Sequence, residues 1–305
     1  MNVLEIQQLR KAFATNQVLD GLDMVVPENS VFGFVGRNGA GKTTTMKIIV
    51  GLLPADSGRI TVCGEEVIYG SAKTNRHIGF LPDVPEFYGY MRPHEYLRLC
   101  GKITGLAKKE IDDRAEELLD LVGLGDVRRR IGGFSRGMKQ RLGIAQALIN
   151  EPRLLICDEP TSALDPIGRR QVLDILASIK GRTTVLFSTH ILSDVERICD
   201  RVAVLEGGRL VLSGTISELQ RQYRSNSFQI RFGDLEQAQA FGDCPELQQP
   251  AIDVQQDGDG LTIVMEDGAG DGQMLINLLA EKGITPVKFE ILEPTLESLF
   301  TEVVQ

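Results

Sequence analysis

A glycine-rich segment with one lysine and two threonines is the first part of this chain that could do chemistry. Residues 36–44 read GRNGAGKTT, which fits the phosphate-binding pattern G-x-x-x-x-G-K-[ST]. The glycines let the backbone bend so that its N–H groups surround a phosphate, and the lysine brings a positive charge to the β- and γ-phosphates. We therefore expect a nucleotide site that is formed by Gly36, Arg37, Asn38, Gly39, Ala40, Gly41, Lys42, Thr43 and Thr44.

Two carboxylates end an apolar segment farther along the chain, where residues 154–159 read LLICDE. Unpaired buried carboxylates are costly, so packing alone does not explain them. Taken alone, the segment is more typical of a strand end with solvated acids, but the phosphate-binding loop in the same chain favours a catalytic site. We expect Asp158 and the Thr43 hydroxyl to hold Mg²⁺, and Glu159 to orient and deprotonate the attacking water.

One histidine also follows an apolar segment, because residues 187–192 read FSTHIL. A single histidine is more often a structural residue than a catalytic one. His190, however, ends a predicted strand of the same sheet, at the edge where ligands of open α/β sheets bind. We expect it to contact the γ-phosphate and to bridge to the attacking water.

The elements that must position these residues alternate between strands and helices. Apolar runs predict strands at 31–36, 153–159, 183–190 and 201–208, with helical stretches between them, and this order indicates a mainly parallel sheet. NVLEIQQL (2–9) and LDMVVPENSVFGFVG (22–36) also alternate or run apolar between turn residues, and they are predicted to form strands. Around 86–150 the pattern is helical, with one apolar face at Ile111, Ala115, Leu118, Leu119 and Val122.

A second helix start lies in GGFSRGMKQ, residues 132–140. Ser135 occupies an N-cap position, and a helical pattern continues through Leu148. The N–H groups at such a start favour an anion. The phosphate-binding loop lies about a hundred residues earlier, so these residues leave open which anion binds here, and a well-capped helix without a ligand is the alternative.

The character of the chain changes after about residue 222. The pattern predicts the order βαββαβ of a ferredoxin-like α+β unit, followed by one more helix. The expected bounds are strand 227–232, helix 235–242, strands 251–256 and 261–265, helix 272–282, strand 285–291 and helix 295–303, after a linker at 221–227. We therefore expect two domains, 1–221 and 227–305.

Charge, hydropathy and cysteine content exclude several classes of protein. The net charge is −9, and residues from Arg221 onward hold 15 Asp and Glu against 5 Lys and Arg. The chain is therefore a poor candidate for nucleic-acid binding, which needs a basic face. No apolar run approaches the roughly 20 residues of a membrane span, and the N-terminus lacks the apolar region of a secretory signal. Five cysteines without a C-x-x-C pair favour reduced thiols in the cytosol, with neither disulfides nor zinc.

Five motifs in one order resemble the nucleotide-binding subunit of ATP-binding cassette (ABC) transporters over residues 1–220. They are GRNGAGKTT, FSRGM, LLICDEP, SALD and STH. The resemblance implies an α/β P-loop NTPase with a RecA-like parallel sheet, an antiparallel β subdomain and a helical subdomain at about 86–150. The family signature is usually L-S-G-G-Q, and in FSRGM only the serine and the second glycine match. This variant, followed by KQRLGIAQAL, resembles the drug- and lipid-export branch, whose partners are ABC-2-type membrane proteins.

The resemblance also implies roles for residues outside the phosphate-binding loop. Ser135 and Gly137 would bind the γ-phosphate of ATP held by the other subunit of a homodimer, or of a heterodimer with a related ATPase. Phe13 would stack on adenine, with core packing as the alternative. Asp83 stands where the family commonly has glutamine, and we carry over the metal role to it. Phe87, Tyr88 and Tyr90 are suited equally to core packing and to docking a helix of the membrane partner.

The expected function is ATP hydrolysis that powers export through a separate ABC-2-type permease, with ATP and Mg²⁺ as cofactors. The chain would then be peripheral on the cytoplasmic face of the membrane. A soluble ABC ATPase that acts on DNA, ribosomes or a signalling partner is the alternative, and the resemblance disfavours an importer subunit. The C-terminal unit shows no catalytic cluster, so dimer contact, regulation, partner docking and a passive extension all remain open for it.

Overall fold

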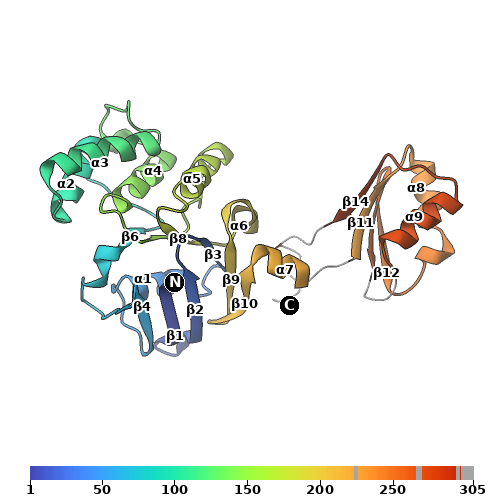
Figure 1. Ribbon diagram of the computed structural model, residues 1–305, viewed down its shortest axis with the longest axis horizontal. Coiled ribbons are helices and arrows are strands. Elements are labelled where there is room, and N and C mark those ends of the chain that lie inside the picture. The colour runs from blue at the N-terminus through green and yellow to red at the C-terminus, as the bar shows by residue number, and fades with distance from the viewer. Residues whose placement is uncertain (223–225, 266–269, 293–295, 297–305) are drawn as a thin grey trace. The chain divides into compact units, whose positions relative to one another are not determined.

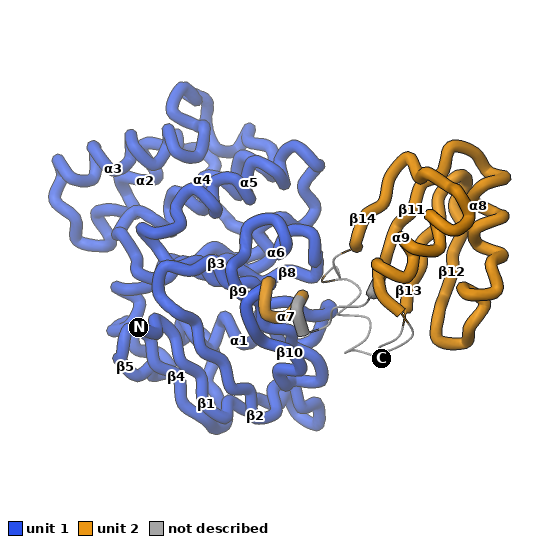
Figure 2. Tube along the Cα trace, turned by 45° about the vertical axis from the view of Figure 1, so that its right-hand side comes forward, with its two compact units in different colours: residues 1–216, 303–305 blue, residues 217–302 orange. Residues whose placement is uncertain are grey.

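The computed structural model describes residues 1–222, 226–265, 270–292 and 296. These residues fall into two compact units, one from Met1 to Ile216 and the other from Ser217 onward (Figure 2). The predicted linker, 221–227, includes residues 223–225, which lie outside the described part. Each unit has its own hydrophobic core.

A six-stranded sheet forms the centre of the first unit, in the order β10-β9-β3-β8-β7-β6. All neighbouring pairs from β9 to β6 are parallel, and β10 is an antiparallel edge strand. Strands β3, β7 and β8 are buried along their whole length, as expected for a parallel sheet covered on both faces. The bounds are β3 Val31–Val35, β6 Ile78–Leu81, β7 Leu154–Cys157, β8 Thr184–Thr189, β9 Arg201–Glu206 and β10 Arg209–Thr215.

Two layers cover this sheet (Figure 1). On one side lie α4 (Arg136–Ala147), α5 (Pro166–Ser178) and α6 (Leu192–Ile198). On the other side lie α1 (Lys42–Ile49) and a four-stranded antiparallel sheet in the order β2-β1-β4-β5. The strands of that sheet are β1 Asn2–Phe13, β2 Asn16–Pro27, β4 Ser57–Val62 and β5 Glu65–Glu66. One cluster of buried side chains joins this sheet, α1 and the central sheet into a single core.

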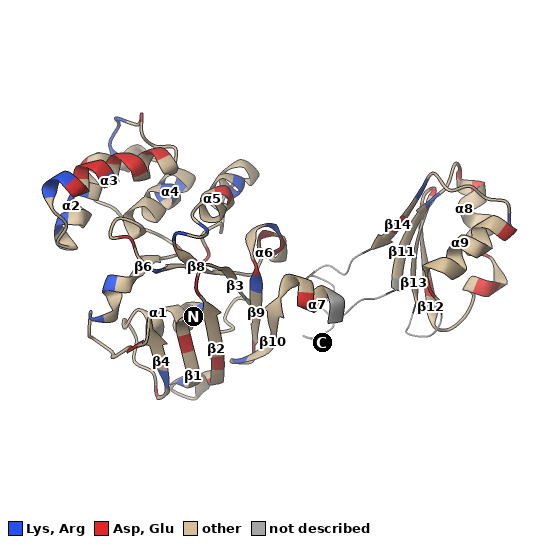
Figure 3. Cartoon of the chain, in the orientation of Figure 1, with Lys and Arg blue, Asp and Glu red and all other residues tan. Residues whose placement is uncertain are grey.

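A helical part is inserted between β6 and β7, and it contains α2 (Pro93–Ile103), α3 (Lys108–Leu121) and α4. The predicted apolar face from Ile111 to Val122 is confirmed, because all five of its residues are buried. Most of the acidic residues of α3 (coloured red in Figure 3) are exposed, which is typical of a solvated helix face. The insertion returns to the central sheet through α4, which packs against β6.

The second unit has a four-stranded sheet in the order β12-β13-β11-β14, in which every neighbouring pair is antiparallel. With one helix after the first strand and one before the last, this is the predicted ferredoxin-like arrangement. The bounds are β11 Asn226–Arg231, α8 Leu235–Gly242, β12 Ile252–Asp257, β13 Gly260–Met265, α9 Gly272–Glu281 and β14 Lys288–Leu292, with α7 (Ile216–Gln222) before them.

Two predicted elements of this unit are not matched in full by the described structure. The prediction that the last strand begins at residue 285 is wrong, since β14 begins at Lys288. Pro286 has no N–H to donate to a ladder, and pairing begins with the bond from Val287 N to Arg231 O, 2.7 Å. The predicted helix 295–303 lies outside the described residues except for Leu296.

Candidate nucleotide site

The phosphate-binding loop connects β3 to α1 as a tight turn. β3 ends at Val35 and α1 begins at Lys42, so residues 36–41 reverse the chain at the carboxyl edge of the sheet. Gly41 is the N-cap of α1 with φ 111°, and a Cβ atom there would lie 2.8 Å from Leu19 Cδ2. Only glycine fits this conformation and this space. No side chain caps the start of α1 in the described structure, so its first N–H groups can bind an anion.

A cleft of about 530 Å³ opens beside this loop, within the usual size range of ligand sites. Its lining comes from the N-terminal sheet, the loop with α1, and the segments that follow β6, β7 and β8. The lining residues are Phe13, Val18, Asn38, Gly39, Gly41, Lys42, Thr43, Thr44, Asp83, Glu159, Ser162 and His190. The fold thus brings most of the predicted site residues to one cleft, although they are separated by up to 177 positions in the chain.

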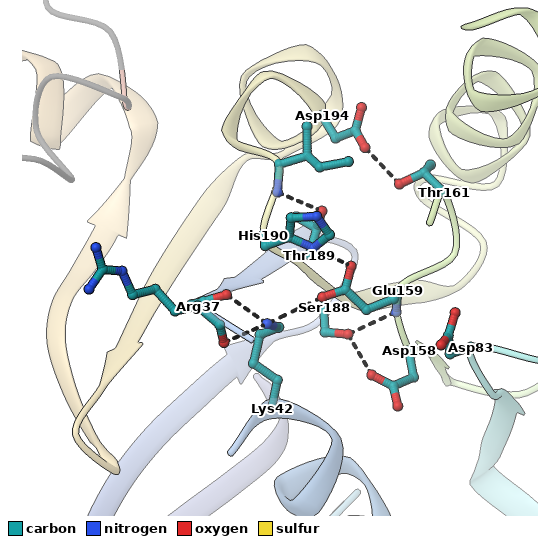
Figure 4. Close-up of polar contacts among 12 residues, drawn as sticks. Arg37, Lys42, Asp83, Asp158, Glu159, Thr161, Ser188, Thr189, His190 and Asp194 are labelled. Atoms are coloured by element: carbon teal, nitrogen blue, oxygen red, sulfur yellow. Dashed lines mark hydrogen bonds and ion pairs between the residues drawn. The ribbon is translucent and has the colours of Figure 1, made fainter. Parts of the chain in front are cut away.

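The ammonium group of Lys42 is held by the loop and by one carboxylate. Its Nζ donates to the carbonyl oxygens of Gly36 (2.6 Å) and Arg37 (3.2 Å) and lies 3.2 Å from Glu159 Oε1 (Figure 4). The Lys42 and Glu159 side chains are only 6% and 13% exposed. Any phosphate that binds Lys42 must therefore compete with this buried ion pair.

Asp158 is buried behind the cleft and joins two elements. Its Oδ1 accepts hydrogen bonds from Thr43 Oγ1 (3.1 Å) and from Ser188 Oγ (2.7 Å). Ser188 Oγ in turn accepts from the backbone N–H of Glu159 (2.9 Å). Ser188 was not among the predicted site residues, although it lies two positions before His190 in FSTH. It orients both acidic residues, because β7 and β8 are parallel neighbours and end at the same edge.

Glu159 has the geometry of a strained residue at a reacting position. Its φ is 47°, in the left-handed region that non-glycine residues seldom adopt. Its Oε2 lies 3.0 Å from His190 Nδ1, while its buried Oε1 accepts no hydrogen bond from any described residue. Oε1 is the oxygen that faces Lys42 Nζ, so it becomes available to accept a proton or a hydrogen bond from a ligand when Lys42 binds a phosphate instead.

The oxygens around Thr43 and Asp158 fit a magnesium ion that is shared with a ligand. A hydroxyl and a carboxylate are ligands of the kind that Mg²⁺ prefers, and Mg²⁺ commonly binds one or two protein groups together with substrate phosphates. Among the described residues, no group of three or more His, Cys, Asp or Glu could hold a metal by itself. A cation here would take its remaining ligands from the bound phosphates and water.

Asp83 lies in the segment after β6 and faces the same cleft. Its Oδ1 accepts from Arg136 Nη2 at 3.3 Å. Burial raises the pKa of the Asp83 carboxyl, and the nearby Asp158 and Glu159 raise it further, whereas Arg136 opposes this shift. Two acidic side chains thus line the cleft with a third behind them, and Arg136, which does not line this cleft, partly offsets their charge.

The remaining predicted residues lie in two places. Phe13 lines the cleft with 47% of its surface exposed, so it is not a core residue, and Lys11 Nζ lies 5.3 Å from its ring centroid. Ser135 is the N-cap of α4 and accepts from Met138 N at 3.2 Å, with Gly137 in the first turn. Neither Ser135 nor Gly137 is among the described residues that line the cleft.

The aromatic segment before α2 divides between packing and exposure. Phe87 is partly buried, and its ring centroid lies 5.1 Å from that of Tyr96. Tyr88 and Tyr90 are exposed neighbours with centroids 5.9 Å apart. Phe87 therefore packs as the core-packing alternative expects, whereas Tyr88 and Tyr90 lie on the surface.

A partly buried ion pair near Glu159 was not among the predicted features. Asp194, in α6, is buried and accepts from Thr161 Oγ1 (2.7 Å) and Arg169 Nε (2.6 Å). Asp165 caps α5 by accepting from Gly168 N at 3.1 Å. Together these bonds fix the segment that follows Glu159, which contains SALD.

Comparisons with known proteins agree with this geometry. Residues 19–162 match the family described as ABC transporter, and residues 214–304 match the ATP-binding protein DrrA1-3-like C-terminal domain. The chain is 37% identical over 303 residues to the uncharacterized ABC transporter ATP-binding protein YxlF of Bacillus subtilis, covering 99% of each chain. It is 34% identical over 305 residues to the bacitracin transport ATP-binding protein BcrA of Bacillus licheniformis, covering 99% of this chain and 97% of that protein.

A solved structure supports the same assignment. The ATP binding subunit of an ABC transporter superposes with a TM-score of 0.66 and 34% sequence identity, covering 72% of this chain and 93% of the other. The phosphate-binding loop, Glu159 after β7 and the histidine after β8 line one cleft, and relatives match nearly the full length of the chain. The chain therefore belongs to the ATP-binding proteins of ABC transporters, and it is an ATPase whose nucleotide is ATP.

Proposed function

We propose that this chain closes as a dimer on MgATP and powers export through a separate ABC-2-type permease. The observation that carries the proposal is the contact chain Lys42–Glu159–His190, in which the lysine proposed to bind phosphate lies beside the proposed general base. In this proposal Lys42 breaks its ion pair with Glu159 and binds the β- and γ-phosphates. Glu159 is then free to accept the proton of the attacking water, oriented by His190.

Thr43 and Asp158 are the proposed magnesium ligands, and Asp83 lines the same cleft but is paired with Arg136 in the described structure. When bound, Mg²⁺ would neutralise charge on the phosphates. Ser188 holds the Asp158 carboxylate, and its hydroxyl accepts the N–H of Glu159, so it positions both acidic residues. Phe13 is the proposed adenine-stacking residue, because its exposed ring borders the cleft.

The position of Ser135 and Gly137 supports a dimer. They stand at an N-terminus that suits an anion, but they do not line the cleft of their own chain in the described structure. A second copy, or a related ATPase, that brings its own cleft to this helix start would supply the anion. Each nucleotide would then be bound by Lys42 of one chain and by Ser135 of the other.

The membrane partner and the direction of transport are inferred from similarity and surface. The relative from Bacillus licheniformis is named for bacitracin transport, and the C-terminal unit matches a DrrA-like domain. No helix in the described part of the chain is long and apolar enough to cross a membrane. The chain would therefore act at the cytoplasmic face on a separate permease, and the exposed Tyr88 and Tyr90 beside Asp83 are candidates for its docking surface.

Light scattering of a Glu159→Gln variant tests the dimer. With MgATP we expect a particle of twice the 33.5 kDa chain mass, and with ATP and EDTA a single chain. Single chains under both conditions, even in the presence of the permease, would contradict the proposal. Co-purification with a co-expressed six-span protein tests the transport role, and loss of that complex in a Tyr88→Ser, Tyr90→Ser variant would identify the docking surface.

A further inference from the structure

An ion pair joins the nucleotide cleft to the first turn of α4. Asp83 follows β6, and Arg136 is the first residue of α4, directly after Ser135. Asp83 Oδ1 and Arg136 Nη2 are 3.3 Å apart, and the two side chains are 45% and 44% exposed. In the described structure Arg136 is the one cation paired with Asp83. The pair therefore connects two segments that are 53 positions apart in the chain.

Asp83 forms part of the wall between two clefts. On one side it lines the nucleotide cleft together with Lys42 and Glu159. On the other side it lines a second cleft of about 400 Å³ together with Arg136 and Gln140. Asp83 thus borders both clefts, whereas Arg136 lines the second cleft and is not among the residues that line the nucleotide cleft.

The charges explain why such a restraint is needed. Asp83 shares the nucleotide cleft with Glu159, and Asp158 lies directly behind it. A triphosphate entering this cleft adds further negative charge, so an unrestrained Asp83 carboxylate would repel it. Asp83 stands at the loop position where ABC transporter ATP-binding subunits commonly have a neutral glutamine. Arg136 stands at the signature position where they usually have a glycine. The two residues that differ from the usual family pattern, Asp83 and Arg136, contact each other.

We propose that Arg136 is a positioning residue of the ATPase site, which holds the Asp83 carboxylate against the wall of the cleft and away from the incoming phosphates. The inference rests on the proposed function, because it requires MgATP in this cleft. It also gives the chain a direct link between its two half-sites. The loop that borders its own nucleotide is tied to the helix start that we propose serves the nucleotide of the other chain.

A double-mutant cycle in the full-length chain tests this role. ATP hydrolysis is measured as phosphate release over a range of MgATP concentrations for Arg136→Gln, Asp83→Asn and the double variant. We expect Arg136→Gln to raise KM about fivefold, in the range of an exposed ion pair, with a smaller effect on kcat. In the Asp83→Asn background the same change should alter KM less than about twofold, because no carboxylate remains to be restrained.

Two further variants separate positioning from structure and from general charge. Arg136→Lys keeps a cation and should restore KM to within about twofold of the wild type. Lys139→Gln is the matched control, because Lys139 lines the same second cleft but no described carboxylate pairs with it, so its KM should stay at the wild-type value. Thermal unfolding of every variant checks that the fold is retained.

The outcomes distinguish this inference from the proposed function. Equal effects of Arg136→Gln in the wild type and in the Asp83→Asn background would overturn the positioning role alone. An effect of Lys139→Gln as large as that of Arg136→Gln would also overturn it, since any cation near the cleft would then serve. A wild-type chain that neither binds nor hydrolyses MgATP would contradict the proposed function, and this inference with it.

Discussion

Replacing Glu159 with glutamine should change hydrolysis and binding in opposite directions. The substitution keeps the shape of the side chain but removes the carboxylate that we assign as the general base. It also removes the partner of Lys42, whose Nζ lies 3.2 Å from Glu159 Oε1 in a buried pair. MgATP could then bind Lys42 without first breaking an ion pair with a carboxylate.

The magnitude of the binding effect follows from that distance. At 3.2 Å, the Coulomb attraction is about 5 kcal/mol with an effective dielectric constant of about 20. Hydration of the separated charges offsets most of this, so a net cost of about 1–2 kcal/mol remains for breaking a contact between two charged groups. We therefore expect Glu159→Gln to bind MgATP roughly tenfold more tightly. Loss of a general base should lower kcat by about 10²–10⁴-fold.

A fluorescent ATP analogue measures affinity, and phosphate release measures turnover. Glu116→Gln, on the exposed side of α3, is the matched control for the loss of one negative charge, and it should change neither quantity. Turnover of Glu159→Gln at the wild-type rate would refute the general-base assignment. Unchanged or weaker binding would refute the reasoning that the ion pair competes with the nucleotide.

Four other substitutions have defined outcomes. Lys42→Ala should abolish binding of the ATP analogue, and unchanged affinity would remove the phosphate-binding assignment. Ser188→Ala should lower kcat about 10–100-fold, because two acidic residues lose a hydrogen bond to one hydroxyl; a normal kcat would show that their positions do not depend on it. Asp83→Gln should retain hydrolysis, and an inactive enzyme would make this aspartate an obligatory metal ligand. Gly79→Ala should destabilise the fold by about 1–3 kcal/mol in thermal unfolding, because a Cβ atom would lie 2.1 Å from the last carbonyl oxygen of α4. Gly133→Ala, with open space around its Cβ position, is the control.

Local patterns in the sequence were sufficient for the main elements and for the family. The strand before GRNGAGKTT and the helix after it follow from an apolar run and a turn-forming segment, so the loop could be placed without coordinates. The apolar face of α3 follows from its helical spacing. The strand and helix order after residue 225 was sufficient to predict a ferredoxin-like unit, because each element there alternates or repeats at its own period.

The contacts that make the site work were decided by the tertiary structure. Three contacts depend on how the strands and helices pack together. They are Lys42 with Glu159, Ser188 with Asp158, and Arg136 with Asp83. Hydrophobic periodicity is a local property and carries no information on such distant pairs. The sequence by itself determined which chemical groups are present and the order of the elements that hold them. Only packing of the parallel strands at one edge decided which groups meet, because side chains at the ends of different strands share no local pattern.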